Sequence, residues 1–213
     1  IVQYGKIINC KLFKNLKLGI DPKLFTSSQV KKFFSKYNSV KKIKINLIDQ
    51  ISNNYSMNKK PFFSIKDEII GENYKKKIDR IVNFLKKNKL NYIFISAPEN
   101  VAWLLNIRGN DNPNSPIPNS HLIITKEKKL FLFAEKYKVN KIIKNKEINK
   151  NQFVQISEIK LYINNLSKGT FVIDSSTCSI YYENFIKNNF KISKKNDPIY
   201  ALIAIKNTSE INH

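Results

Sequence analysis

The spacing of hydrophobic residues changes twice within residues 73–105, NYKKKIDRIVNFLKKNKLNYIFISAPENVAWLL. Its first half repeats apolar residues every three or four positions, which predicts an amphipathic helix with lysines on the opposite face. Residues 90–96 form a nearly continuous run of isoleucine and aromatic side chains, which is typical of a buried strand. Pro98 then marks the turn into a short second helix. A helix, a strand and a helix in immediate succession favour an α/β layer structure.

The next part of the sequence extends this alternation. Residues 122–125 and 130–134 flank a short turn, and this pattern predicts a β-hairpin. The other predicted elements are a helix at 156–166, a strand at 171–173, a helix from Ser176 or Thr177 through Ile186, and an extended stretch from Asp197 to Ile205. We therefore predict an α/β fold with a mixed β-sheet flanked by helices.

The N-terminal segment has its own strands and helices. We expect strands at 16–20 and 40–45, with a helix between them that Thr26 or Ser27 caps. Residues 52–60, rich in Asn, Ser and Lys, are the best candidate for a domain boundary. At the other end, Asn207 and Glu210 have the spacing of a capping box, which predicts that a helix starts there.

Composition limits the function classes. The net charge is +22, but all basic residues except Arg80 and Arg108 are lysines, and they are spread along the chain. Since arginine is preferred for base readout and phosphate recognition, we interpret the lysines as solvated faces and do not expect a nucleic-acid partner. No apolar run is long enough for a membrane span. Cys10 and Cys178 are interpreted as reduced thiols of a cytoplasmic protein.

The sequence has few residues suited to catalysis. Its two histidines are His121, which precedes an apolar strand, and His213, the last residue. We interpret His121 as a strand residue and not as a metal ligand. The HExxH and GxSxG patterns are absent, so we predict neither catalytic residues nor a metal site in this stretch.

One cluster is a candidate site. Residues 103–111, WLLNIRGND, place the only Trp and one of the two Arg beside a glycine and an acid. In one interpretation, Arg108 and Asp111 pair to hold the loop and Trp103 lies in the core. In the other, the loop faces a cleft shared with another domain and offers a guanidinium and a carboxylate to a peptide.

The run Glu99-Asn100-Val101-Ala102-Trp103-Leu104-Leu105-Asn106-Ile107-Arg108-Gly109 resembles a segment of the three-domain Xaa-Pro aminopeptidases, which are pita-bread metallopeptidases. In that family an acid, a proline and a β-hairpin also come after it. Shorter similarities occur in order at Gly19-Ile20-Asp21-Pro22, Gly71-Glu72, Lys77-Ile78, Ala204-Ile205-Lys206-Asn207 and Glu210-Ile211. Two departures are Ile20 and residues 114–118, where the family often has aromatic residues.

The resemblance implies a domain organisation. Residues 1–60 would be the C-terminal part of a first creatinase N-terminal-like domain, and 61–202 a second such domain. Residues 203–213 would begin a catalytic pita-bread domain that this sequence lacks. The family's metal ligands (two Asp, one His and two Glu) lie in that catalytic domain, where they hold two divalent ions, usually manganese.

The resemblance also implies a role. The whole protein would remove the N-terminal residue from short peptides with proline in second position. This chain would be non-catalytic and would cap the cleft and support a homodimer, with Trp103, Arg108 and Asp111 as candidate cleft residues. Two alternatives remain open, namely an inactive relative that binds a protein partner and a module that binds nucleic acid through lysines.

Overall fold

The structure, a computed structural model, describes residues 17–34, 39–51, 58–145 and 147–212. These residues pack as two compact units. The first comprises the described residues up to 51 together with 175–185, and the second comprises 58–174 together with 186–212. The predicted domain boundaries at residues 60 and 202 rest on family resemblance and stay predictions.

The first unit is built around a pair of parallel strands. Its elements are β1 (Lys17–Ile20), α2 (Ser27–Phe33), β2 (Ser39–Lys42) and α3 (Leu47–Ile51). Thr26 caps α2 in a reciprocal capping box with Gln29, so the predicted cap is confirmed. Ile20 and Phe34 pack against Ile180, which belongs to the segment 175–185. The remote segment thus completes the small core of this unit.

The second unit contains a six-stranded mixed sheet in the order β10-β9-β4-β6-β7-β8. All neighbours pair in parallel except β6, which is antiparallel to both β4 and β7. The strands are β4 (Tyr92–Ile95), β6 (His121–Thr125), β7 (Leu130–Ala134), β8 (Phe153–Gln155), β9 (Thr170–Ile173) and β10 (Lys191–Lys194). The predicted mixed sheet and the β6–β7 hairpin are confirmed.

The helices of this unit keep to the predicted alternation, with several additions. They are α4 (Asp67–Ile70), α5 (Tyr74–Lys87), α6 (Pro98–Leu105), α7 (Lys136–Lys144), α8 (Ile159–Asn164), α10 (Pro198–Ala204) and α11 (Thr208–Asn212), with 3₁₀ turns η2 (Lys150–Gln152) and η3 (Ile156–Glu158). A short antiparallel pair joins β3 (Phe63–Ser64) to β5 (Ile107–Arg108). Helix α9 (Ile180–Asn189) begins in the first unit and ends in the second.

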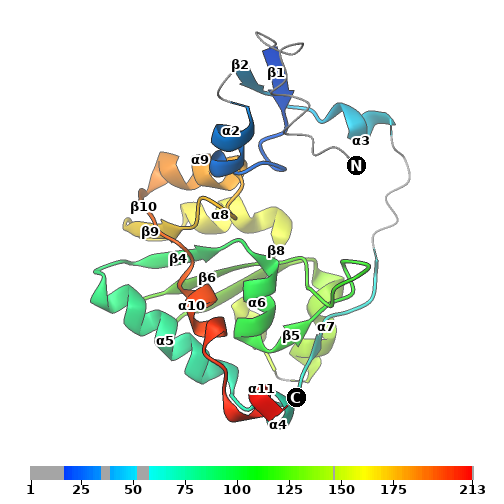
Figure 1. Cartoon of the computed structure of the whole chain (residues 1–213), viewed down its shortest axis with the longest axis vertical. Coiled ribbons are helices and arrows are strands. Elements are labelled where there is room, and N and C mark those ends of the chain that lie inside the picture. Colours follow the sequence, from blue (N-terminus) through cyan, green and yellow to red (C-terminus); the bar gives the residue numbers. More distant parts are fainter. Residues whose placement is uncertain (1–16, 35–38, 52–57, 146, 213) are drawn as a thin grey trace. The chain divides into compact units, whose positions relative to one another are not determined.

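Residues alternate between the two faces of the sheet, and each face has its own side chains. One face is aliphatic, with Ile93, Leu122, Ile124 and Leu132 in the same core cluster as apolar residues of α5, α6, α7 and α10. Figure 1 shows α5, α6 and α10 together on one side of the sheet and α8 on the other. The opposite face is aromatic, and there Phe131 and Phe133 of β7 pack against Tyr162 of α8.

The predicted extended stretch from Asp197 to Ile205 is wrong, because most of it is helix α10. Asp197 is the N-cap, and its side chain accepts a hydrogen bond from the backbone N–H of Ile199 at 3.0 Å. Pro198 occupies the first helical position, where a missing N–H costs nothing. The Asp-Pro pair therefore starts a helix here instead of breaking one.

Two smaller predictions are tested directly. Asn207 and Glu210 form the predicted capping box of α11, with Glu210 N donating to Asn207 Oδ1 at 2.9 Å and Asn207 N donating to Glu210 Oε2 at 3.1 Å. Cys178 is buried and forms no disulfide with another described residue, as predicted, while Cys10 lies outside the described residues. Across the ranges that the structure describes, no helix has the length and apolar character needed to cross a membrane.

Candidate functional site

Trp103 lies on α6, near the point where that helix ends. The helix stops after Leu105 because Asn106 adopts the left-handed conformation, with φ 56° and ψ 30°. Asparagine tolerates this conformation better than most residues, since its short side chain forms local hydrogen bonds. The turn at Asn106 directs the chain into β5, which carries Arg108.

Asn106 uses its whole side-chain amide in this turn. Its Oδ1 accepts a hydrogen bond from Lys77 Nζ at 2.7 Å. Its Nδ2 donates to the backbone O of Glu72 at 2.8 Å and to Asp67 Oδ1 at 3.3 Å. Asn106 is 3% exposed, so these bonds connect α4 and α5 to the end of α6 within the protein interior. Asn106 is not among the site residues predicted from the sequence.

Lys77 is an exception to the predicted solvated lysines, because it is only 1% exposed. Its ammonium lies 4.1 Å from the centre of the Trp103 ring and donates to the backbone O of Trp103 at 2.9 Å. Burial lowers the pKa of Lys77 from 10.5 to about 8, although Glu72 and Glu210 partly oppose this shift. The residue falls on the apolar stripe of the helix, four positions before Ile81, which is the signal that sequence reasoning missed.

Arg108 is partly buried and holds the end of α6. Its Nη1 donates to the backbone O of Ala102 at 3.2 Å and to the backbone O of the preceding residue, Ile107, at 2.9 Å. The C-terminal end of a helix carries partial negative charge, so a guanidinium there is stabilising. Burial lowers the pKa of Arg108. An arginine nonetheless keeps its charge in proteins.

Asp111 pairs with a lysine and not with Arg108, so the interpretation in which Arg108 and Asp111 hold the loop as a pair is wrong. Its Oδ1 forms an ion pair with Lys138 of α7, and its Oδ2 accepts from the backbone N–H of Asn119 at 2.7 Å. Lys138 also donates to the backbone O of Asn58. Lys138 is 4% exposed and is a second buried exception among the lysines.

The loop between β5 and β6 is closed by hydrogen bonds between its own residues. Gly109 N donates to Pro116 O at 3.2 Å, and the Asp111–Asn119 bond closes the same loop. A Cβ on Gly109 would lie 2.7 Å from the Cα of Pro118, so only glycine fits at this crossing. The loop therefore has a defined shape that the surrounding fold maintains.

The three predicted site residues are close in sequence but have separate partners. Trp103 Nε1 donates to Glu210 Oε1 at 3.3 Å, Arg108 binds the end of α6, and Asp111 binds Lys138. Each side chain is thus used structurally. Whether any of them contacts a substrate stays a prediction.

No set of three His, Cys, Asp or Glu side chains that could hold a metal ion occurs in the part of the chain that the structure describes. The described residues therefore do not fit a two-ion centre. His121 lies at the start of β6 with its ring 5.5 Å from that of Phe94. Burial lowers the pKa of His121 from 6.5 to about 4, and a hydrogen bond with the backbone of Ser96 opposes this only in part.

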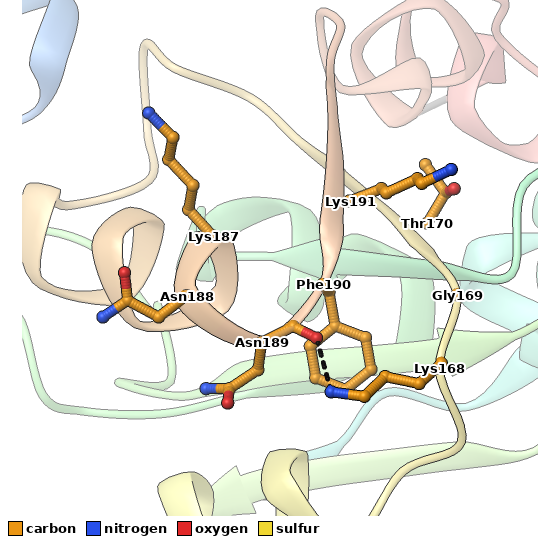
Figure 2. Close-up of a pocket in the computed structure, with 8 residues that line it drawn as sticks. All are labelled: Lys168, Gly169, Thr170, Lys187, Asn188, Asn189, Phe190 and Lys191. Atoms are coloured by element: carbon orange, nitrogen blue, oxygen red, sulfur yellow. Dashed lines mark hydrogen bonds between the residues drawn. The ribbon is translucent and has the colours of Figure 1, made fainter.

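A basic cavity of about 560 Å³ lies where β9 and β10 begin and α9 ends. Figure 2 shows that the ammonium groups of Lys168, Lys187 and Lys191 point in different directions around it. Lys168 donates to the backbone O of Asn189 at 3.2 Å, at the C-terminus of α9. Lysines at such an end complement the helix dipole. Because the three ammonium groups do not converge, the cavity lacks the geometry of an anion site.

Comparisons with known proteins add to this geometry. Residues 53–210 match the model of the creatinase/prolidase N-terminal domain. The chain is 29% identical over 143 residues to Xaa-Pro aminopeptidase 1 of Dictyostelium discoideum, covering 61% of this chain and 22% of that protein. It is 30% identical over 142 residues to the Xaa-Pro aminopeptidase ApepP of Drosophila melanogaster, covering 62% of this chain and 23% of that protein.

A solved structure has the same fold over nearly the whole chain. It is the X-prolyl aminopeptidase of Caenorhabditis elegans, described as a cytosolic enzyme with a di-nuclear active site. The TM-score is 0.81 at 20% identity, covering 99% of this chain and 36% of that one. This chain thus spans less than two fifths of the length of that protein, and about a quarter or less of the Dictyostelium and Drosophila relatives.

Proposed function

Since this chain belongs to the creatinase/prolidase N-terminal domain family, we propose that it is the non-catalytic N-terminal portion of an Xaa-Pro aminopeptidase. The observation that carries this proposal is the similarity, over about three fifths of the chain, to two proteins named as Xaa-Pro aminopeptidases. The whole protein would then hydrolyse the first peptide bond of short peptides whose second residue is proline. The domains are assigned as 1–60, 61–202 and 203–213, with the catalytic domain beginning in the last segment.

The chemistry is assigned to that catalytic domain. A pair of divalent ions, manganese by family resemblance, would supply an activated water there. Since no cluster of metal-ligating side chains occurs among the described residues, this chain is proposed to act through shape and charge. It is also proposed to contribute to a homodimer and to act in the cytoplasm, without a membrane or nucleic-acid partner.

The loop that starts at Gly109 is the proposed cap of the active-site cleft. Its shape is held by Asp111, so it needs little reorganisation when a peptide enters. Arg108 hydrogen-bonds the end of α6 through Nη1 alone. Its Nε and Nη2 groups are therefore the proposed donors to a peptide carbonyl or carboxylate.

The test uses the full-length protein with manganese and tripeptides that have proline or alanine in second position. We expect hydrolysis only of the proline peptide. Arg108→Ala should raise KM by about tenfold, the effect of losing one charge-assisted hydrogen bond. Arg80→Ala is the matched control, since Arg80 is the only other arginine and pairs with Glu72.

The outcomes separate the parts of the proposal. If the full-length protein hydrolyses neither peptide, the chain belongs to an inactive relative and the enzyme proposal fails. If the protein is active but Arg108→Ala leaves both kcat and KM unchanged, the assignment of Arg108 to the cleft fails.

A further inference from the structure

The segment 205–212 has its own hydrogen-bonded structure. Helix α11 has only five residues, and a helix that short does not form in isolation because nucleation is unfavourable. The Asn207–Glu210 capping box closes its first turn. Contacts with the rest of the unit must supply the remaining stabilisation.

The first of these contacts is with α4. Asn207 Nδ2 donates to the backbone O of Ile70 at 2.8 Å. The next residue, Gly71, has φ +78°, and a Cβ there would lie 2.6 Å from Ser209 Oγ. The glycine therefore ends α4 and at the same time leaves room for the start of α11. Figure 1 shows α4 and α11 side by side.

The second contact is with α6. Glu210 uses one carboxylate oxygen for the capping box and the other, Oε1, to accept from Trp103 Nε1 at 3.3 Å. The Trp103 ring is held on its face by Lys77, whose ammonium is 4.1 Å from the ring centre. Glu210 and Lys77 also attract each other electrostatically. A buried cation, an indole and a carboxylate thus join α5, α6 and α11.

We propose that Trp103 and Glu210 are positioning residues that make the segment 205–212 a rigid connection to the catalytic domain. This assignment deepens the proposed function and rests on it, since it assumes that the rest of the catalytic domain comes after α11. A flexible linker would let the capping loop sample many orientations, whereas a docked helix presents it in one. A misplacement of about 1 Å that arises far from the reacting groups can lower a rate about 100-fold.

Cleavage after Lys206 by trypsin measures how often the segment 205–212 opens. Lys206 is exposed and lies between α10 and α11, so trypsin can cleave after it once the docked segment opens locally. Trp103→Phe removes the indole N–H and keeps an aromatic ring under Lys77. Glu210→Ala breaks the same contact from the other side and also removes the capping-box bond from Asn207 N to Glu210 Oε2. Tyr200→Phe is the matched control, because it removes one side-chain hydrogen bond, 2.9 Å to Glu99, from the neighbouring α10.

In the full-length protein, we expect Trp103→Phe to speed cleavage after Lys206 about fivefold, the effect of one lost hydrogen bond on a local opening equilibrium. Glu210→Ala should speed cleavage by more than that, because it also loses the capping-box bond. Both variants should lower kcat for the proline tripeptide more than they raise KM, because they disturb placement and not a substrate contact. Tyr200→Phe should change cleavage and kcat by less than about twofold.

Unchanged cleavage in both variants of an active protein would overturn the positioning role and leave the proposed function standing. An effect in only one variant would also overturn it. Glu210→Ala alone would then act through the lost capping-box bond, and Trp103→Phe alone would not act through the pair. If the full-length protein lacks peptidase activity, the proposed function fails, and with it the role of this segment in catalysis.

Discussion

Lys138 and Asp111 form an ion pair across 27 residues of sequence, and their side chains are only 5% and 14% exposed. The pair joins helix α7 to the loop after β5 in a place where water is largely excluded. Since Lys138 also donates to the backbone O of Asn58, its ammonium holds two separate segments. The shape of the proposed capping loop thus depends on a helix that the sequence did not mark as related to it.

Removing the Asp111 carboxylate is expected to lower the free energy of unfolding. Asp111→Ala leaves the Lys138 ammonium buried without its counter-ion, and breaking a buried pair from one side costs about 3–5 kcal/mol. Asp79→Ala is the control, because the Lys128–Asp79 pair is 52% and 48% exposed and such pairs contribute less than about 1 kcal/mol. Urea denaturation measures the loss of stability in each of the two variants. Equal losses in the two variants would contradict a special role for the Asp111 pair.

Because of Lys77, we expect the stability of the protein to depend on pH in the alkaline range. The pKa of Lys77 is about 8 in the folded chain and is ordinarily 10.5, so between these values the unfolded state binds more protons. The free energy of unfolding therefore gains a contribution that rises with pH from about 8 to 10.5, by at most about 1.4 kcal/mol per pH unit. Below pH 8 both states are protonated and the full penalty of the buried charge is present.

This expectation is checked by comparing how the free energy of unfolding changes with pH in the parent protein and in two variants. Lys77→Met removes the titrating group and should flatten the rise between pH 8 and 10, measured by urea denaturation at each pH. Lys75→Met removes an exposed lysine of the same helix and should leave the slope unchanged. Parallel slopes in the parent and in Lys77→Met would show that Lys77 titrates normally.

Local spacing is enough to predict most of the fold. The helix at 74–85, the strand at 90–96 and the hairpin at 122–134 are all predictable, because each depends on the alternation of residues close in sequence. The Asp197-Pro198 pair is ambiguous, because the same two residues favour either a turn or the first turn of a helix. The next residues decide between the two, since 199–203 are apolar enough to pack as a helix on α5 and α6.

The site is harder to predict because it depends on which distant charges meet. The sequence offers Arg108 as the near partner of Asp111, but the fold brings Lys138 instead. Lys138 lies four positions before Ile142 on the buried stripe of α7, which marks it as a candidate buried lysine but does not identify Asp111 as its partner. Lys77 is recognisable in principle from its position on an apolar stripe, whereas its contact with Trp103 depends on the packing of α5 against α6.

His121 gives the last prediction, on the acid side. Its pKa is about 4 in the folded chain and is ordinarily 6.5, chiefly because burial disfavours the charged imidazolium. As pH falls below about 6.5, His121 binds a proton in the unfolded state but not in the folded state. Stability is therefore lost between pH 6.5 and 4, by at most about 1.4 kcal/mol per pH unit, and this term is fully present above pH 6.5.

His121→Gln removes this titration and keeps a polar side chain at the start of β6. We expect the parent protein to lose more stability than the variant between pH 7 and pH 5, as measured by urea denaturation. An NMR titration gives an independent reading, because the imidazole resonance missing from His121→Gln should not shift until the pH approaches 4. A resonance that shifts near pH 6.5 would mean that water reaches the ring, and the acid-side loss of stability would then have another source.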